Sequence, residues 1–199
     1  MVPFLHIIDD FLDEPMAMRA MALRLRYELK GTYPGRNSLE TIGMPGIEQF
    51  ASELAGEPLK AMPPPGSHGH CRLSIASDPV EADVHVDPSH WTGVLYLSLE
   101  QNCEGGTDFF VHKRTGLERV PRTLKELERV GYASFDEFKC DLVDRDGPDR
   151  SKWELTSRVA MRFNRLVLLQ PQYWHTSGRG FGATPEDGRL VYLMFFRLA

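Results

Sequence analysis

The alternation of apolar and polar residues divides the chain into a helical first part and a second part rich in strands. Residues 4–8 form a short apolar run that is typical of a strand. Asp13, Glu14 and Pro15 then supply an N-cap candidate and a first-turn proline, which mark the start of a helix. Apolar residues follow every three or four positions, as on one buried helical face: Met16, Ala20, Leu23 and Tyr27. We expect this helix to end at Gly31.

A second helix is predicted over residues 47–55, between loops rich in proline and glycine. Pro-Gly pairs mark turns within residues 31–46, and residues 61–70 are expected to form a loop. Residues 1–70 are therefore predicted to be a mainly helical N-terminal part.

From Cys71 onward the pattern changes to short apolar or alternating runs, which predict strands. The predicted strands cover residues 72–76, 84–87, 93–99, 107–112, 158–164, 165–169 and 189–196. A charged insertion, residues 113–157, separates two strand regions at 71–112 and 158–199 and is expected to be helical at 122–130 and 134–142. This order predicts a single domain, 1–199, of the α+β class that is mainly β, with the N-terminal helices packed on a sandwich or barrel.

Composition narrows the range of partners. The chain has 199 residues, 42% of them hydrophobic, and a net charge of −5, which disfavours nucleic acid because phosphate binding requires a basic surface. No apolar run approaches the ~20 residues that span a bilayer, and residues 1–6 do not resemble a secretory signal. The three cysteines are odd in number and far apart, so we expect no disulfide framework and a cytoplasmic location.

His85 and Asp87 are the strongest candidates for chemistry. On a strand, side chains two positions apart share a face and lie about 6.6 Å from each other, so this pair can bind one metal ion. Taken alone, the pair also fits a hydrogen-bonded surface pair. With His175, which follows a predicted strand, the set becomes two imidazoles and one carboxylate, a facial set typical of non-haem Fe(II) oxygenases.

Six segments in their order along residues 83–197 resemble the core of the 2-oxoglutarate/Fe(II)-dependent dioxygenases, and most closely the prolyl-hydroxylase-like branch. They are His85-x-Asp87, 92–98, 104–109, 165–169, His175 and 189–196. The resemblance implies a double-stranded β-helix, which is a cupin-like jelly roll. It also implies Fe(II) as the metal, and 2-oxoglutarate and O₂ as co-substrates.

The same resemblance assigns roles to two further residues. Arg189 takes the place of the arginine that binds the far carboxylate of 2-oxoglutarate, a group that arginine can hold through two charge-assisted hydrogen bonds. Tyr96 matches the tyrosine that hydrogen-bonds the same carboxylate. Arg179 and Arg197 compete with Arg189 for this role. Because halogenases of the superfamily lack the carboxylate ligand, Asp87 favours hydroxylation.

Loops at the mouth of such a barrel usually select the substrate. We expect Arg36, Arg72 and Trp91 to bind a small-molecule or amino-acid-like substrate. Two alternatives are open: a cupin-like metalloenzyme that does not use 2-oxoglutarate, and a non-enzymatic jelly-roll binding protein. The other histidines near these segments are expected to be structural or surface residues: His68, His70, His90 and His112.

Overall fold

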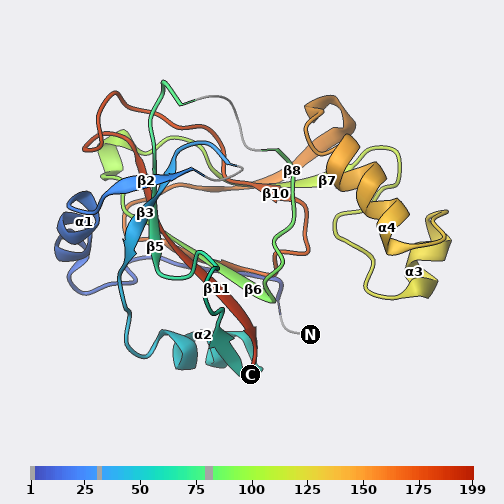
Figure 1. Ribbon diagram of the computed structural model, residues 1–199, viewed down its shortest axis with the longest axis horizontal. Coiled ribbons are helices and arrows are strands. Elements are labelled where there is room, and N and C mark those ends of the chain that lie inside the picture. Colours follow the sequence, from blue (N-terminus) through green and yellow to red (C-terminus); the bar gives the residue numbers. More distant parts are fainter. Residues whose placement is uncertain (1–2, 31–32, 79–82) are drawn as a thin grey trace.

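The computed structural model describes residues 3–30, 33–78 and 83–199 and is mainly β, with antiparallel strands in two sheets (Figure 1). The larger sheet has the order β1 (Leu5–Ile8), β9 (Leu166–Leu169), β6 (Trp91–Tyr96), β11 (Arg189–Leu198), β5 (His70–Ser74), β3 (Arg36–Thr41) and β2 (Tyr27–Lys30), with β4 (Leu59–Ala61) also pairing with β11. The smaller sheet has the order β10 (His175–Thr176), β7 (Gly106–His112) and β8 (Trp153–Ala160).

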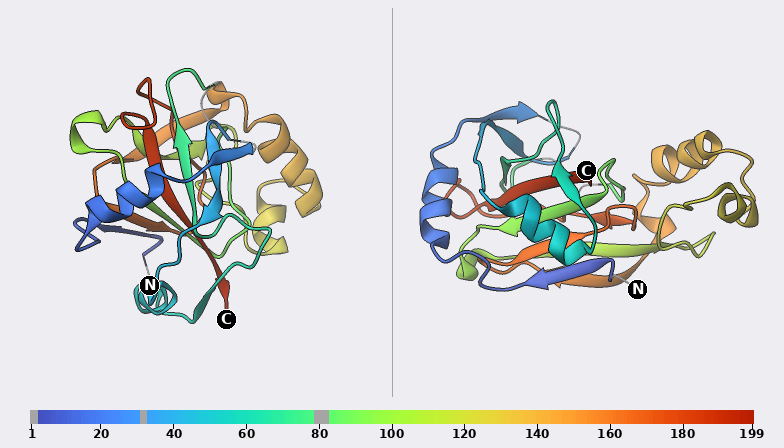
Figure 2. Two further views of the ribbon diagram at one scale, coloured as in Figure 1. Left: turned by 60° about the vertical axis from the view of Figure 1, so that its left-hand side comes forward. Right: turned by 90° about the horizontal axis from the view of Figure 1, so that it is seen from below.

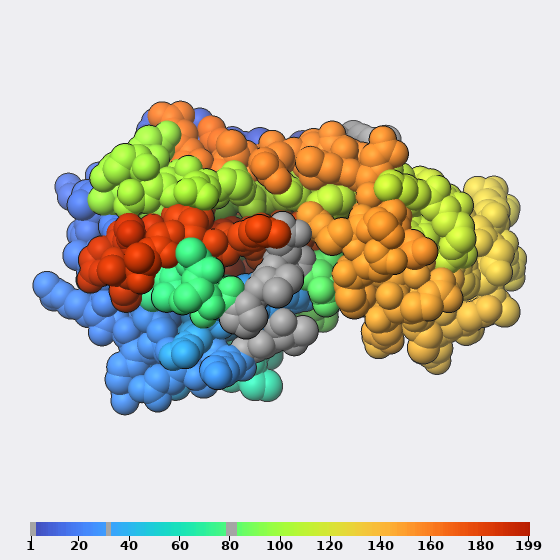
Figure 3. All heavy atoms as spheres, turned by 90° about the horizontal axis from the view of Figure 1, so that it is seen from above, coloured from blue at the N-terminus to red at the C-terminus, as the bar shows by residue number. Residues whose placement is uncertain are grey.

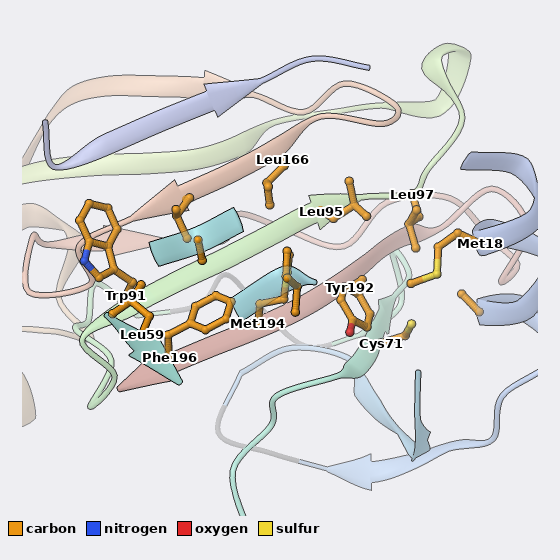
Figure 4. Close-up of a cluster of buried hydrophobic side chains, with 14 of the residues drawn as sticks. Met18, Leu59, Cys71, Trp91, Leu95, Leu97, Leu166, Tyr192, Met194 and Phe196 are labelled. Carbon is orange, nitrogen blue, oxygen red and sulfur yellow. The ribbon is translucent and has the colours of Figure 1, made fainter. Parts of the chain in front are cut away.

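Strand β11 contributes to both faces of the larger sheet, because its side chains alternate between them. Its even-numbered residues pack in a core with α1 (Pro15–Leu23) and α2 (Ile47–Ala55), as Figure 4 shows for Tyr192, Met194 and Phe196. Its odd-numbered residues face the smaller sheet, where Val191 and Leu193 join a second apolar cluster with Tyr96 and Phe109. Residues 189, 191, 193 and 195 share one face of this strand, and all four line one cavity.

A third cluster lies under α3 (Leu124–Arg129), α4 (Phe135–Phe138) and the π-helical turn Lys139–Arg145. Apolar side chains from these turns, among them Leu127 and Phe138, pack on Trp153 and Trp174. The segment projects from one end of the molecule, beyond β7 and β8 (Figures 2 and 3). Two helical turns in the insertion were predicted from the sequence, and this prediction is confirmed.

The N-terminal part is less helical than predicted. Helix α1 ends at Leu23, and Tyr27–Lys30 forms β2, which pairs with β3 in a region predicted to be turns. Strand pairing with β5, through Asn37 opposite Arg72, orders this hairpin, and a helical period cannot reveal such a partner. The second helix, Ile47–Ala55, is confirmed.

Two strand predictions also need correction. Residues 84–87 do not form a regular strand; only His85 is bridged, to His175. Strand β8 starts at Trp153, inside the segment predicted as an insertion, and it ends at Ala160 rather than Asn164. None of the described helices is long and apolar enough to cross a bilayer.

Gly105 and Gly106 lead into β7, and they provide a matched test of this close packing. Both have positive φ, but a Cβ on Gly106 would lie 1.9 Å from the Val159 carbonyl oxygen, whereas nothing lies within 4 Å of one on Gly105. We expect Gly106→Ala to lower the free energy of unfolding by about 2 kcal/mol or more, and Gly105→Ala by about 1 kcal/mol, measured by urea denaturation. Equal effects would contradict the close approach of β7 to β8.

Candidate metal centre

A cavity of about 110 Å³ lies between the two sheets and contains most of the candidate residues. One end carries His85, Asp87 and His175, and another part of the lining carries Arg189. Apolar side chains of the larger sheet form the wall between these polar groups: Val94, Leu169, Val191, Leu193 and Phe195. The remaining lining residues are Tyr33, Ser67, Arg72, Thr92, Thr107, Thr176 and Ser177.

His85, Asp87 and His175 come together as a possible metal site. One ligand atom from each lies within 4.8 Å of the other two. The Nε2 atoms of His85 and His175 lie 3.8 and 3.5 Å from the two carboxylate oxygens of Asp87. A pair of backbone hydrogen bonds fixes the arrangement, because the amide of each histidine donates to the carbonyl of the other, at 3.0 and 3.1 Å.

The backbone also fixes which nitrogen of each ring faces the centre. Nδ1 of His85 lies 2.7 Å from the carbonyl oxygen of Asp83, and Nδ1 of His175 lies 2.8 Å from that of Tyr173. Since a carbonyl oxygen only accepts hydrogen bonds, each Nδ1 carries the proton and each Nε2 keeps its lone pair. Two lone pairs and a carboxylate therefore point at one place, an arrangement that a cation stabilises.

The protonation states agree with this assignment. Burial lowers the pKa of His85 to about 4, which keeps its imidazole neutral. Burial opposes ionisation of Asp87, but its interactions with His175 and His85 and the hydrogen bond from the Thr92 hydroxyl outweigh this effect and lower the pKa of Asp87 to about 2. A neutral imidazole and an ionised carboxylate are the forms that bind a metal ion.

Thr92 orients the carboxylate ligand from behind. Its hydroxyl donates to Oδ2 of Asp87 at 2.9 Å, and it lies 2.7 Å from the hydroxyl of Ser89. Asp87 is also held through its backbone amide, which donates to the carbonyl of Pro171 at 3.2 Å. Such contacts behind a ligand fix its orientation and support metal affinity.

Arg189 is the second polar feature of the cavity. The residue is 3% exposed, and its Nε and Nη2 atoms are buried without a hydrogen-bond partner in the described part of the chain. Burial lowers the pKa of this guanidinium because it disfavours the charged form. A buried, unpaired cation is costly, so Arg189 fits a carboxylate ligand that the protein itself does not provide.

Tyr96 lies beside Arg189 but is fully buried and does not line the cavity. The centre of its ring is 5.9 Å from Cζ of Arg189, and its hydroxyl lies 2.7 Å from that of Thr107. Thr107 does line the cavity. The tyrosine hydroxyl is therefore one hydrogen bond away from the surface that a ligand would touch.

The three residues expected to contact substrate are separated in the structure. Arg72 lines the cavity. Trp91 does not: it is fully buried in the core on the other side of the sheet, and its Nε1 donates to Glu57 at 2.8 Å. The expectation of a substrate contact is wrong for Trp91, because the alternation along β6 turns it away from the cavity. Arg36 is exposed at the start of β3 and is not part of the cavity lining.

The competing candidates lie elsewhere. Arg197 is exposed near the end of β11, and Arg179 lines a different pocket beside Asp108 and Arg158. His90 contacts Glu57 at 2.8 Å, and His112 contacts Asp146 at 3.1 Å. His68 and His70 contact the backbone carbonyls of Phe195 and Ser38.

Thr92 and Thr107 were not predicted as site residues. A usable signal existed for Thr92, because it shares the face of Val94 and Tyr96 on one strand. No comparable pattern marks Ser67 or Ser177, which reach the cavity from segments outside the strands.

Solved structures show what class of fold this is. The carbocyclase SnoK, described as α-ketoglutarate-dependent and from nogalamycin biosynthesis, is 16% identical with a TM-score of 0.57, and the match covers 100% of this chain and 81% of SnoK. HygX from Streptomyces hygroscopicus, crystallised with nickel, 2-oxoglutarate and hygromycin B, is 13% identical with a TM-score of 0.56, covering 100% of this chain and 84% of HygX. A prolyl hydroxylase from Trichoplax adhaerens is 11% identical with a TM-score of 0.50, covering 98% and 83%.

The fold is thus that of the 2-oxoglutarate-dependent oxygenases, and the resemblance seen in the sequence motifs is confirmed at the level of the fold. No curated protein sequence matches the chain. The chain belongs to a family of unknown function, DUF6445, whose model matches residues 3–196.

Two of the threonines that line the cavity, Thr92 and Thr107, allow the role of Thr92 to be tested. Thr92→Val keeps the shape of the side chain but removes the hydrogen bond to Asp87, so we expect about tenfold weaker Mn(II) affinity, measured by calorimetric titration. Thr107→Val is the matched control, because its hydroxyl contacts Tyr96 rather than a ligand. Equal Mn(II) affinity in the two variants would show that Thr92 does not support the metal site.

Proposed function

We propose that the protein is an Fe(II)- and 2-oxoglutarate-dependent oxygenase that hydroxylates a small molecule and releases succinate and CO₂. The observation that supports this most strongly is the combination of His85, Asp87 and His175 with the unpaired guanidinium of Arg189 in one cavity. A metal site alone fits many proteins. A metal site facing a buried cation fits a co-substrate with a chelating end and a distant carboxylate.

The residues of the cavity fit both groups. His85, Asp87 and His175 would hold Fe(II) on one face, leaving positions for the keto oxygen and the near carboxylate of 2-oxoglutarate and for O₂. When bound, Fe(II) supplies the activation of O₂ coupled to oxidative decarboxylation of 2-oxoglutarate. Because Asp87 occupies the carboxylate position, hydroxylation is proposed rather than halogenation.

Arg189 would bind the far carboxylate of 2-oxoglutarate. Its Nε and Nη2 atoms need acceptors, and a carboxylate offers two in the matching planar geometry. Tyr96 would support this carboxylate site in two ways. Its hydroxyl is hydrogen-bonded to that of Thr107, and its ring lies beside the guanidinium of Arg189. The apolar wall formed by Val94, Val191 and Leu193 would exclude water from the co-substrate.

We also infer that the two antiparallel sheets form a double-stranded β-helix and that residues 1–199 constitute one domain. The position of the cavity between the sheets, with metal ligands on one side and Arg189 on the other, supports this reading.

Thermal stability separates the proposal from its two alternatives. A ligand at about 100 times its dissociation constant adds about 2.7 kcal/mol to folded-state stability. We expect Mn(II) to raise the Tm by several degrees, and 2-oxoglutarate to raise it further only when Mn(II) is present. Asp87→Ala should lose both shifts, and Arg189→Gln only the second.

Arg197→Gln is the matched control, since Arg197 lies on the same strand but is exposed. A Mn(II) shift without any effect of 2-oxoglutarate would favour a cupin-like metalloenzyme. The absence of both shifts in the unmodified protein would favour a binding protein.

Turnover gives the second test. Aerobic incubation with Fe(II), 2-oxoglutarate and candidate small-molecule substrates should release succinate, detected by chromatography, while the second oxygen atom of O₂ enters the hydroxylated product. Asp87→Ala should abolish it, because only two of the three protein ligands would remain. Succinate release that persists in this variant would refute the proposed metal centre.

A further inference from the structure

Arg72 is a second arginine of the cavity, and the proposed co-substrate leaves it without a partner. It lies on β5, directly opposite Val191 of β11 and Asn37 of β3, so its side chain shares the cavity side of the sheet with Val191. No carboxylate pairs with it among the residues that the structure describes. Its side chain contacts a neutral amide, that of Asn37, and the aromatic ring of Tyr33.

These contacts hold the side chain without neutralising it. Nε of Arg72 donates to Oδ1 of Asn37 at 2.7 Å, and Asn37 is itself buried and bonded to Ser67. Cζ lies 5.5 Å from the centre of the Tyr33 ring. Nε of Arg72 is thus already hydrogen-bonded, whereas its two terminal nitrogens have no hydrogen-bond partner in the ranges 3–30, 33–78 and 83–199. The guanidinium is therefore positioned with its outer edge available.

Tyr33 connects Arg72 to the metal end of the cavity. The centre of its ring lies 4.3 Å from that of His85, so the ring contacts both the arginine and a metal ligand. Arg72 is also more exposed than Arg189, which is 3% exposed. Of the two arginines, Arg72 is thus the one that a molecule entering after the co-substrate could reach.

The balance of charges in the cavity also favours an anion as the molecule that reaches Arg72. The charged residues that line the cavity are Arg72, Arg189 and Asp87. With a divalent ion and doubly charged 2-oxoglutarate in place, four positive charges face three negative ones. Burial, and after it the neighbouring charge of Arg189, lowers the pKa of Arg72, and Tyr33 and Asp87 offset this only in part. One further negative charge would complete the balance.

We propose that Arg72, held by Asn37 and flanked by Tyr33, binds a carboxylate of the primary substrate and thereby selects anionic small molecules. This inference rests on the proposed function, since it assigns to a substrate the charge that the metal and co-substrate leave uncompensated. Arginine suits the role because its planar fork matches a carboxylate. Arg72 acts here as a specificity-determining residue, separate from Arg189.

The test uses acetate as the probe and acetamide as its neutral counterpart of the same size. The full chain is loaded with Mn(II) and 2-oxoglutarate under argon, at constant ionic strength. Paramagnetic relaxation of the probe's methyl protons then reports binding near the metal without any turnover. We expect a saturable effect with acetate and none with acetamide.

Three variants assign the effect to Arg72. R72Q should weaken acetate binding at least tenfold while leaving Mn(II) and 2-oxoglutarate affinities within about twofold. R72K keeps the charge without the fork and should give an intermediate affinity; it also serves as the test if R72Q does not fold. R36Q is the matched control, because Arg36 is exposed on the neighbouring strand and outside the cavity.

The possible failures differ from one another. Lack of Mn(II) or 2-oxoglutarate binding by the unmodified protein would refute the proposed function itself. Normal binding of both, with no saturable acetate effect or with acetate bound equally by R72Q, would overturn only the role of Arg72. Loss of 2-oxoglutarate affinity in R72Q would also overturn it, since Arg72 would then belong to the co-substrate site.

Discussion

The buried guanidinium of Arg189 is the constraint on which the architecture of the cavity depends. A cation that is 3% exposed and lacks partners for two of its nitrogens among the described residues destabilises an apolar core unless a counter-charge is present. The cavity beside Arg189 leaves room for such a charge, because packed side chains do not fill that space. At the other end of that cavity, the unprotonated Nε2 atoms of His85 and His175 and the carboxylate of Asp87 face one another. The end with Arg189 therefore favours a bound anion, and the end with the two histidines and Asp87 favours a bound cation.

The strand β11 makes this arrangement possible. Its even-numbered side chains enter the core under α1 and α2, which stabilises the sheet, while its odd-numbered side chains line the cavity. The cavity-lining side chains of β11 are thus held in place by a well-packed layer on the other side of the strand. Neighbouring strands extend the same face, with Tyr96 and Arg72 both opposite Val191. Tyr96 and Arg72 therefore flank Val191 in one row across β6, β11 and β5, and they place polar groups beside an otherwise apolar wall.

The candidate metal ligands are held in place in a different way. His85 and Asp87 lie outside any regular strand, and their positions depend on the paired backbone hydrogen bonds to His175 and on Pro171. Trp174, next to His175, anchors that segment in the cluster beneath α3 and α4. The projecting segment therefore supports the site from outside, by packing against Trp174 next to the start of β10.

The sequence by itself indicated His85, Asp87 and His175 as candidate metal ligands, through their residue types and the motifs around them. It also determined the placement of Arg189 on an apolar strand, the helix at 47–55 and the mainly β second half. These three features follow from local patterns, which are the alternation along a strand and the period of a helix. Only the tertiary structure decided that Tyr27–Lys30 is a strand, that Trp91 points into the opposite core and that Thr92 and Thr107 belong to the site. Strand partners and the choice of buried face depend on residues far away in the chain, and local periodicity carries no information about them. For the same reason, Arg72 is one of several arginines in the sequence, and only the pairing of β3, β5 and β11 places it in the cavity.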